Sequence, residues 1–285
     1  MNKIVTGAAG FIGSHLCKNI GSSAVKVDPA NEKMLTPEQI LFELKQKVKA
    51  FDCLYHLGAV SSTTENDIAK LTQNNILFSC ELLNICIEKK IPFIYASSAS
   101  VYGLGNNGFK ETVQLEPLNY YAISKAAFDM YALQKIIDNP EAKIVGLRYF
   151  NVYGKNEEHK KDMASPVHKF IQQAKITGKI NIFEGSENFV RDFIHSDDVV
   201  NATIAAREFK SGIYNIGTGH PRSFRDVADI VARHLDAEII EIPFPKHLVG
   251  KYQKYTRSDN NNIDTCGYTT SRICLEAGIR KVIGD

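Results

Sequence analysis

Two side chains with complementary acid–base chemistry lie four residues apart near the middle of the chain. Tyr121 and Lys125 form a Y-x-x-x-K pattern, and residues at i and i+4 share one face of a helix. An ammonium close to a phenol favours the phenolate and lowers the pKa of the phenol. The spacing therefore predicts that Tyr121 acts as a general acid or base near neutral pH. An ordinary surface pair is the alternative interpretation of this motif taken alone.

A glycine-rich segment from Gly7 to Gly13 follows a short apolar run and precedes a helical pattern. Glycine permits a tight turn and a close approach of the backbone to a pyrophosphate. The start of the following helix offers free N–H groups and a partial positive charge. This placement between strand and helix predicts a dinucleotide-binding loop, whereas a tight turn without a ligand is the alternative.

Asp28 lies close to the distance expected for an acidic residue that binds the adenosine ribose of a dinucleotide. A carboxylate there favours NAD because it repels the 2′-phosphate of NADP, although Lys26 and Lys33 could offset that repulsion. The alternative role for Asp28 is a helix or turn cap.

Short β-branched runs alternate with longer amphipathic stretches, which predicts an α/β fold with a Rossmann-like, doubly wound parallel sheet. The strands are expected at residues 4–6, 24–27, 54–57, 92–96 and 143–147, and the helices at 11–20, 75–89 and 121–137. Only one helical pattern, residues 37–50, occupies the segment between Asp28 and Gly58. A full strand–helix–strand–helix stretch does not fit comfortably there, which suggests that the sheet has lost a strand.

The pattern is looser in the second half of the chain. Helices are expected at residues 165–177, 197–206 and 224–234, a strand at 179–183, and mostly irregular structure at 239–267. We therefore expect residues 1–150 to form a dinucleotide-binding domain. Residues 151–285 are expected to form mainly a smaller substrate-binding lobe, with some segments returning to the sheet.

The composition excludes several classes of function. A formal net charge of +2 gives no case for nucleic acid as a partner. No apolar stretch is long enough to cross a bilayer, and the chain starts in a strand-like run with no leader pattern, so we expect a cytoplasmic protein. None of the six cysteines belongs to a C-x-x-C pair and the histidines show no H-x-x-x-H spacing, which favours buried thiols and no metal site.

A serine follows the expected strand at 92–96 and precedes the sequence V-Y-G. Together with the glycine-rich loop and the Y-x-x-x-K motif, it resembles the extended short-chain dehydrogenases/reductases. The resemblance implies that Ser98 orients the substrate, that Tyr121 is the acid/base, and that Lys125 tunes Tyr121 and binds the nicotinamide ribose. It also implies a larger set of cofactor contacts: Gly7, Gly10, Phe11, Ile12, Gly13, Asp28, Leu57, Gly58, Ala59, Asn75, Tyr121, Lys125 and Val152.

Motifs in the second half narrow the resemblance. The segments 148–154 and 191–195 are shared by many nucleotide-sugar enzymes of this type. More specific likenesses are found at residues 61–65, 159–160, 163–165, 183–189, 242–245 and 250–253, and together they resemble the ADP-L-glycero-D-manno-heptose 6-epimerases. The likeness runs from about residue 3 to residue 278, except near 29–52.

This resemblance implies a reaction, its cofactor and an assembly. One tightly bound NADP or NAD per subunit would oxidise the exocyclic C-6 alcohol of ADP-heptose to a transient ketone and reduce it on the other face. Two acid/base groups are needed, and the resemblance assigns these roles to Tyr121 and Lys160. Lysine changes protonation readily when it is desolvated, although residues 157–162 also read as a solvated charged loop. The family also implies a homo-oligomer, with pentamers among its members.

The same resemblance implies the contacts to the nucleotide sugar. They are Ser61, Ser98, Asn151, Lys160, Lys169, Phe183, Glu184, Gly185, Ser186, Arg191 and Tyr252. Arg191 is the best candidate for the diphosphate because a planar guanidinium suits phosphate oxygens, and an inter-lobe salt bridge is its alternative. The chain departs from the family in the short segment after Asp28, at Asp162, which replaces a serine, and at Lys169, which replaces a histidine beside His168.

Two other functions remain to be weighed against epimerisation of a heptose. A UDP-hexose 4-epimerase needs only one tyrosine-type base, and a 4,6-dehydratase usually needs an acidic residue beside the catalytic serine, where this chain has Ala99 and Ser100. A catalytically silent NAD(P)-binding protein often loses Ser98, Tyr121 or Lys125, and all three are present.

Overall fold

A six-stranded parallel sheet forms the larger part of the molecule. The computed structural model describes residues 2–29, 34, 36–46, 51–245, 253–268 and 272–284. The strands follow the order β10-β5-β4-β3-β1-β2. Their bounds are Asn2–Thr6 (β1), Ala24–Val27 (β2), Phe51–His56 (β3), Phe93–Ser98 (β4), Ile144–Tyr149 (β5) and Gly212–Ile216 (β10). β10 comes from the second half of the sequence and pairs in parallel with β5.

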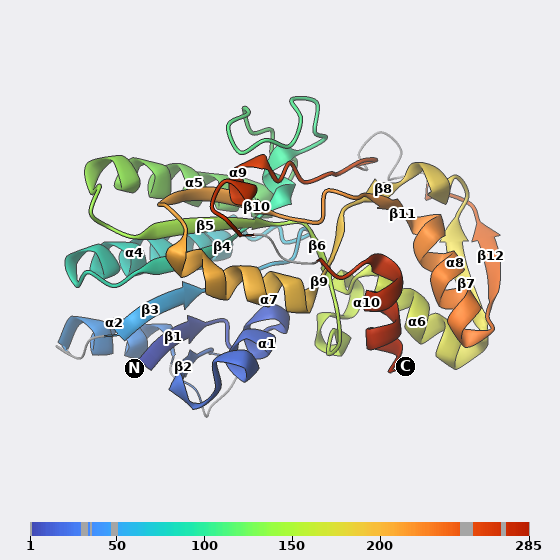
Figure 1. Cartoon of the computed structure of the whole chain (residues 1–285), viewed down its shortest axis with the longest axis horizontal. Helices are drawn as coiled ribbons and strands as arrows, with labels where there is room; N and C mark the ends of the chain where they lie inside the picture. The colour runs from blue at the N-terminus through green and yellow to red at the C-terminus, as the bar shows by residue number, and fades with distance from the viewer. Residues whose placement is uncertain are drawn as a thin grey trace.

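Helices cover both faces of this sheet (Figure 1). One face carries α1 (Phe11–Ile20) and α7 (Ser196–Ala205), and the other carries α2 (Pro37–Gln46), α4 (Phe78–Glu88) and α5 (Tyr120–Asp138). Each face has its own apolar core, for example Leu16 and Val199 on the first and Leu82 and Phe128 on the second. The predicted doubly wound, Rossmann-like fold is confirmed.

The edge of the sheet at β2 is the place where a strand was expected to be lost. Among the described residues, β2 pairs only with β1. The segment that follows β2 forms α2, which buries Ile40 and Leu44 against the sheet. The predicted helix at 37–50 is thus confirmed as far as Gln46, and its remaining residues lie outside the described part.

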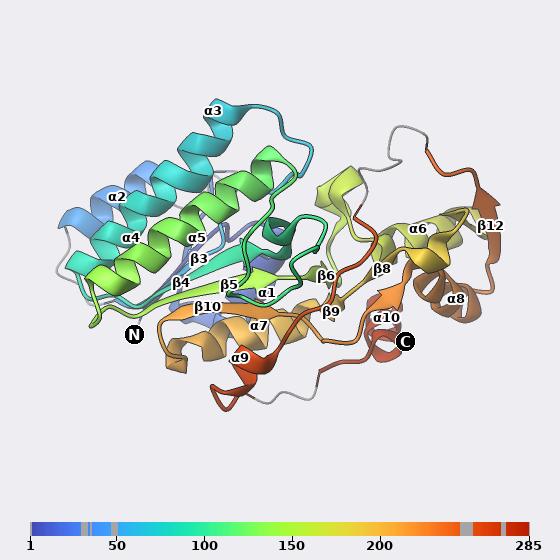
Figure 2. The ribbon, with the colours of Figure 1, turned by 90° about the horizontal axis from the view of Figure 1, so that it is seen from above.

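A smaller lobe lies beyond the carboxyl ends of the main strands (Figure 2). Its described residues form three two-stranded sheets: β6 (Asn151–Tyr153) with β9 (Phe193–His195), β7 (Lys179–Phe183) with β12 (Glu238–Ile242), and β8 (Val190–Arg191) with β11 (Arg222–Ser223). The lobe also contains the helices α6 (Pro166–Thr177), α8 (Phe224–Leu235) and α10 (Leu275–Ile283). Its apolar core joins these three helices to β7. The expectation of irregular structure from residue 239 is wrong for β12, because residues 238–242 pair in parallel with β7.

Short helical segments complete the described chain. They are α3 (Ile68–Leu71), the π-helix η2 (Thr72–Leu77), α9 (Asn261–Asp264) and the 3-10 helices η1 (Gly21–Ser23), η3 (Ala99–Tyr102), η4 (Glu158–Met163), η5 (Ser186–Asn188) and η6 (Ala206–Glu208). Among them, α3 and η2 run directly into α4.

Side-chain caps fix where the functional helices begin. Asn119 accepts a hydrogen bond from the Ala122 amide and so starts α5 directly before Tyr121. Ser165 accepts one from the His168 amide at the start of α6. Such caps satisfy amides that have no partner inside the helix. In the described ranges, no helix combines the length and apolar character that a membrane crossing would require.

Candidate active site

The glycine-rich loop lies where β1 meets α1 and has no room for side chains. Gly7 has φ +68°, and a Cβ atom there would lie 2.6 Å from the Gly58 nitrogen. A Cβ on Gly13 would lie 1.9 Å from the Gly7 oxygen. α1 begins at Phe11 without a side-chain cap and without an acidic residue in its first turn. The free backbone amides at the start of α1 and the positive end of its dipole suit a diphosphate. The loop is therefore compatible with the binding of NAD(P).

Asp28 follows β2 and holds the same loop. Its carboxylate accepts a hydrogen bond from the Ala9 amide at 3.0 Å, and the residue is nearly buried. The alternative role of Asp28 as a turn cap is therefore realised in the structure. A contact of its second oxygen with a ribose stays a prediction.

Three side chains, those of Thr6, His56 and Ser79, form a hydrogen-bonded chain beside this loop. The Gly58 amide donates to the Thr6 hydroxyl, which lies 2.7 Å from Nδ1 of His56. Nε2 of His56 lies 2.8 Å from the Ser79 hydroxyl, which donates to the Asn75 carbonyl. The Thr6 hydroxyl accepts from the Gly58 amide and can donate its own proton to Nδ1 of His56. The Ser79 hydroxyl donates to the Asn75 carbonyl and can accept from Nε2. His56 is therefore assigned the neutral form with its proton on Nε2.

Asn75 clamps the loop that carries Leu57, Gly58 and Ala59. It belongs to the π-helix η2, is 1% exposed, accepts from the Val60 amide at 2.8 Å and donates to the Val60 carbonyl at 3.0 Å. Its amide nitrogen also lies 3.0 Å from Ser124 on α5. Asn75 thus ties the predicted cofactor loop to the helix of Tyr121.

Protonation of His56 should weaken the fold. Complete burial lowers the pKa of His56 from 6.5 to about 3, with a smaller contribution from Lys125. The unfolded chain therefore binds a proton at His56 below pH 6.5, whereas the folded chain binds it only below about pH 3. We expect the free energy of unfolding to fall over this window by up to about 1.4 kcal/mol per pH unit from this residue.

Urea unfolding of the wild type and of His56→Gln at pH 7, 6 and 5 measures this effect. The two proteins share the other titrating groups, including His195, whose pKa burial lowers to about 4. The wild type should lose more stability than the variant between pH 6 and 5, and equal losses would contradict the assignment.

Three of the four residues predicted for catalysis come from the end of β4 and from α5. Ser98 ends β4 and accepts a hydrogen bond from the Ser100 hydroxyl at 2.9 Å. Tyr121 is 9% exposed, and its side chain lies near enough to Ser98 for that hydroxyl to influence its pKa. Lys125, one helical turn on, donates to the Ala96 carbonyl at 2.8 Å. A phenol and a hydroxyl that meet at the carboxyl end of a strand can hold and protonate one substrate oxygen.

Burial controls the protonation of this group. It raises the pKa of Tyr121 above its usual value of 10, while the hydrogen bond with Ser98 opposes the rise and the charge of Asp129 adds to it. Burial also lowers the pKa of Lys125 to about 8, and Asp129 opposes that shift. Desolvation of the phenol dominates here and the Lys125 ammonium is directed at Ala96, so the tuning of Tyr121 by Lys125 stays a prediction.

A buried charged network underlies the catalytic helix. Asp129, one turn beyond Lys125, accepts from the Arg148 Nε at 2.9 Å and from the Tyr95 hydroxyl at 3.0 Å. Arg148 also donates to the Tyr102 hydroxyl at 3.0 Å, and Tyr102 donates to Asn215 at 2.7 Å. Asp129 and Arg148 are at most 2% exposed. The network joins α5 to β4, to β5 and to the turn after Ser98.

Lys160 lies at the border between the phosphate loop and the smaller lobe. Its ammonium is 2.8 Å from the Glu157 carboxylate and 4.6 Å from the centre of the Phe11 ring. Glu157 is fully buried, whereas Lys160 is partly exposed. The structure thus places Lys160 against Phe11, a residue of the predicted cofactor loop. Residues 158, 159, 161 and 162 are exposed, as expected of a solvated charged run, whereas Glu157 is buried within it. Glu157 was not among the predicted site residues, because no local pattern distinguishes it from its exposed neighbours.

Arg191 occupies a short strand beside the C-terminal segment. It is 5% exposed, donates to the Val190 carbonyl at 3.0 Å and to the Gln253 carbonyl, and its guanidinium lies over the Phe224 ring. The amide of Gln253 in turn donates to the Gly103 carbonyl in the turn after Ser98. The side chain of Gln253 therefore connects the segment bound by Arg191, the predicted diphosphate ligand, with the turn after Ser98.

The other predicted substrate residues spread over the lobe. Phe183 ends β7, Glu184 and Gly185 form the turn, and Ser186 begins η5. Asn151 and Val152 lie in β6, which pairs with β9. Lys169 is exposed on α6, where it donates to the Asp162 carbonyl, while the adjacent His168 is buried. Ser61 is exposed next to Ser62, whose hydroxyl contacts the Met163 sulfur. Tyr252 lies outside the described residues.

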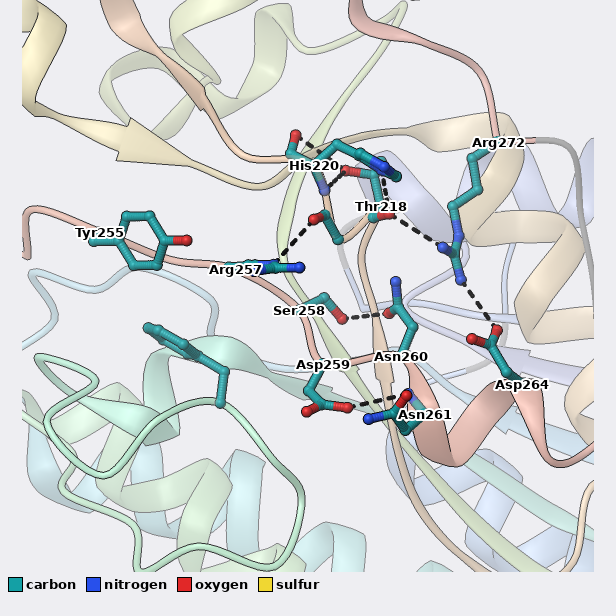
Figure 3. A pocket seen from close by; sticks show the side chains of 12 residues that line it. Thr218, His220, Tyr255, Arg257, Ser258, Asp259, Asn260, Asn261, Asp264 and Arg272 are labelled. Carbon is teal, nitrogen blue, oxygen red and sulfur yellow. Dashed lines mark hydrogen bonds and ion pairs between the residues drawn. The ribbon is translucent and has the colours of Figure 1, made fainter.

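A pocket of about 530 Å³ lies elsewhere, beside the end of β10 (Figure 3). None of the predicted site residues lines it. Its charged groups bind neighbours within the wall: Arg272 binds the Thr218 carbonyl and Asp264, and Arg257 binds the Gly219 carbonyl. These contacts tie the C-terminal segment to the sheet. Within the described ranges, no group of three or more His, Cys, Asp or Glu residues is arranged to hold a metal.

Comparison with known proteins gives the family of the chain and two similar proteins. Residues 3–217 match the NAD dependent epimerase/dehydratase family. The chain is similar to two proteins named ADP-L-glycero-D-manno-heptose-6-epimerase, one from Brachyspira hyodysenteriae (41% identity, 98% of this chain and 95% of that protein) and one from Alkalilimnicola ehrlichii (40% identity, 98% and 96%).

Solved structures resemble the chain over the same extent. The Helicobacter pylori ADP-L-glycero-D-manno-heptose-6-epimerase has a TM-score of 0.83 at 30% identity and covers 99% of this chain and 95% of its own. A UDP-glucose 4-epimerase from Thermotoga maritima, solved with UDP-glucose, has a TM-score of 0.85 at 27% identity and covers 99% and 97%.

Proposed function

The chain belongs to the NAD dependent epimerase/dehydratase family, and from this premise we propose that it is an isomerase that interconverts ADP-D-glycero- and ADP-L-glycero-D-manno-heptose. The observation that carries the proposal is its identity of about 40% with two proteins of that name over nearly their full length. The presence of Ser98 at the end of β4, with Tyr121 and Lys125 one turn apart on α5, supports an active enzyme over a silent binding protein.

The loop and clamp residues are the proposed holders of NAD(P). Gly7, Gly10 and Gly13 bring the backbone and the α1 amides to the diphosphate, and Asn75 and His56 fix the loop of Gly58 beside it. When bound, the oxidised cofactor supplies a positively charged ring that takes hydride from the exocyclic carbon and returns it to the opposite face. Asp28 supports NAD, and the resemblance to the heptose epimerases supports NADP.

Two protein groups manage the alcohol proton in this proposal. Tyr121 exchanges a proton with the C-6 oxygen in one epimer, and the Ser98 hydroxyl holds that oxygen while it changes charge. After the exocyclic bond rotates, the oxygen lies at the other face of the site. There Lys160 exchanges the proton, so that each epimer has its own acid/base. Arg191 binds the diphosphate, and residues 183–186 with Asn151 shape the sugar pocket.

Loss of Lys160 separates this reaction from a one-base epimerisation. The Lys160→Met variant should convert ADP-heptose about 10²–10⁴-fold more slowly, because general acid–base catalysis contributes a factor of that size. Lys161→Met is the matched control, since that neighbouring side chain is exposed. Proton NMR of the stereocentre measures both. Full activity of Lys160→Met, or conversion of UDP-glucose and not of ADP-heptose by the wild type, would favour the alternative of a UDP-hexose 4-epimerase.

We also propose that the protein is a homo-oligomer. Apolar side chains stand exposed on the outer face of α5, which supports a homo-oligomer, with a pentamer as the family suggests: Tyr120, Ile123, Met130, Leu133 and Ile137. Sedimentation velocity of the wild type tests this, and a monomer would contradict it.

The proposed place of action is the cytoplasm, where the enzyme would supply heptose for lipopolysaccharide. Residues 1–150 would bind the dinucleotide and 151–285 mainly the sugar nucleotide.

A further inference from the structure

We infer that Glu157 is a positioning residue that holds the Lys160 ammonium at the cofactor loop, an inference that rests on the proposed function. The starting observation is a carboxylate where the sequence shows only a charged run. Glu157 is fully buried, although residues 155, 156, 158 and 159 around it are exposed. A buried carboxylate is costly unless hydrogen bonds compensate it.

Four hydrogen bonds compensate this carboxylate. Oε1 accepts from the Gly154 amide at 3.1 Å and from the Ser165 hydroxyl at 2.7 Å. Oε2 accepts from the Ser165 amide at 2.8 Å and from the Lys160 ammonium at 2.8 Å. Three of the four donors therefore belong to the end of β6 and the start of α6. These rigid elements fix the carboxylate, and the carboxylate fixes the lysine.

The surroundings show why Lys160 needs such an anchor. A lysine ammonium lies at the end of a flexible stem with four carbons, so a single partner decides where it rests. Here the ammonium is held over the Phe11 ring, at the first residue of α1. The adjacent Lys161 has φ +47° and ψ −121°, a conformation that non-glycine residues rarely adopt. Such strain persists only where surrounding contacts fix the backbone, and the two ends of this loop are both bound by Glu157.

The inference predicts a selective loss of turnover when the carboxylate is removed. Glu157→Gln should lower kcat for ADP-heptose at least about 30-fold, a part of the roughly 10²–10⁴-fold that an acid–base group contributes, while KM changes less than about 3-fold. The decisive readout is a double-mutant cycle. In a Lys160→Met background the same change should lower kcat by less than about 2-fold, because the residue through which Glu157 acts is gone.

Two controls separate positioning from folding. Glu158→Gln alters the exposed neighbour and should keep wild-type kcat. Ser165→Ala removes one partner of Glu157 and the cap of α6 but leaves the ion pair, so it should lower the melting temperature and keep kcat. If Glu157→Gln does not fold, Glu157→Asp replaces it, since the shorter carboxylate keeps the charge but withdraws from Lys160 and should still lower kcat about 10-fold.

The possible outcomes are distinguishable. A wild type that does not convert ADP-heptose would reject the proposed function itself. An active wild type with equal loss from Glu157→Gln in the presence and absence of Lys160, or with a kcat unchanged by Glu157→Gln, would overturn the inference and leave the function standing.

Discussion

Replacing Tyr121 by phenylalanine should lower kcat for epimerisation by about 10²–10⁴-fold, the contribution expected of a general acid or base. The variant loses only the phenol hydroxyl, while the buried ring keeps its packing on α5. Fold and cofactor content should therefore stay at wild-type levels. Turnover of ADP-heptose and the absorbance of the purified protein at the nicotinamide and protein bands measure these quantities.

The adjacent tyrosine provides the control for this substitution. Tyr120 precedes Tyr121 on the same helix, but it is 46% exposed. Tyr120→Phe removes the same atom from a surface position and should leave kcat unchanged. Comparable losses in the two variants, or a Tyr121→Phe variant with normal turnover, would contradict the assignment of the acid/base.

Removal of Arg148 should cause the largest loss of stability. Arg148→Met leaves the Asp129 carboxylate buried without its cation, and breaking a buried pair in this way costs about 3–5 kcal/mol. Asp129 would keep only the hydrogen bond from Tyr95, and Tyr102 would lose its donor. Urea unfolding at pH 7 measures the difference. The loss should be largely recovered in Arg148→Met with Asp129→Leu, because neither charge then remains buried.

A surface arginine gives the comparison for Arg148. Arg225 pairs with Asp229 and Glu241, but its side chain is 41% exposed. Exposed ion pairs contribute about 0–1 kcal/mol, so Arg225→Met should change the free energy of unfolding within that range. Similar losses from Arg148→Met and Arg225→Met would show that the buried network does not support the catalytic helix as described.

The parts of the fold that the sequence predicted are those encoded by local patterns. The glycine-rich loop, the alternation of strands and helices and the Y-x-x-x-K spacing each depend on residues within one or two turns of the chain, and the structure has each of them. The short segment after Asp28 likewise indicated the sheet edge at β2. β12 was missed because its partner β7 is distant in sequence and its own residues lie at the protein surface.

The parts of the site that the sequence did not predict depend on burial. Glu157 belongs to a run of charged residues, and nothing local distinguishes the one buried carboxylate from its exposed neighbours. Asp129 meets Arg148 across two elements, although its i,i+4 spacing from Lys125 was readable. Burial, which raises the pKa of Tyr121, could not be anticipated because the spacing to Lys125 contains no information on desolvation. The residues assigned by resemblance, among them Arg191 and Lys169, stay predictions.

The most direct measurement follows the exocyclic stereocentre of ADP-D-glycero-D-manno-heptose by proton NMR, with purified wild-type protein and no added cofactor. The account predicts conversion to the L-glycero epimer until both epimers are at equilibrium, with no net oxidation, because bound NAD(P) is regenerated in every turnover. No conversion by protein that demonstrably contains NAD(P) would contradict the heptose assignment and direct attention to UDP- and GDP-sugars.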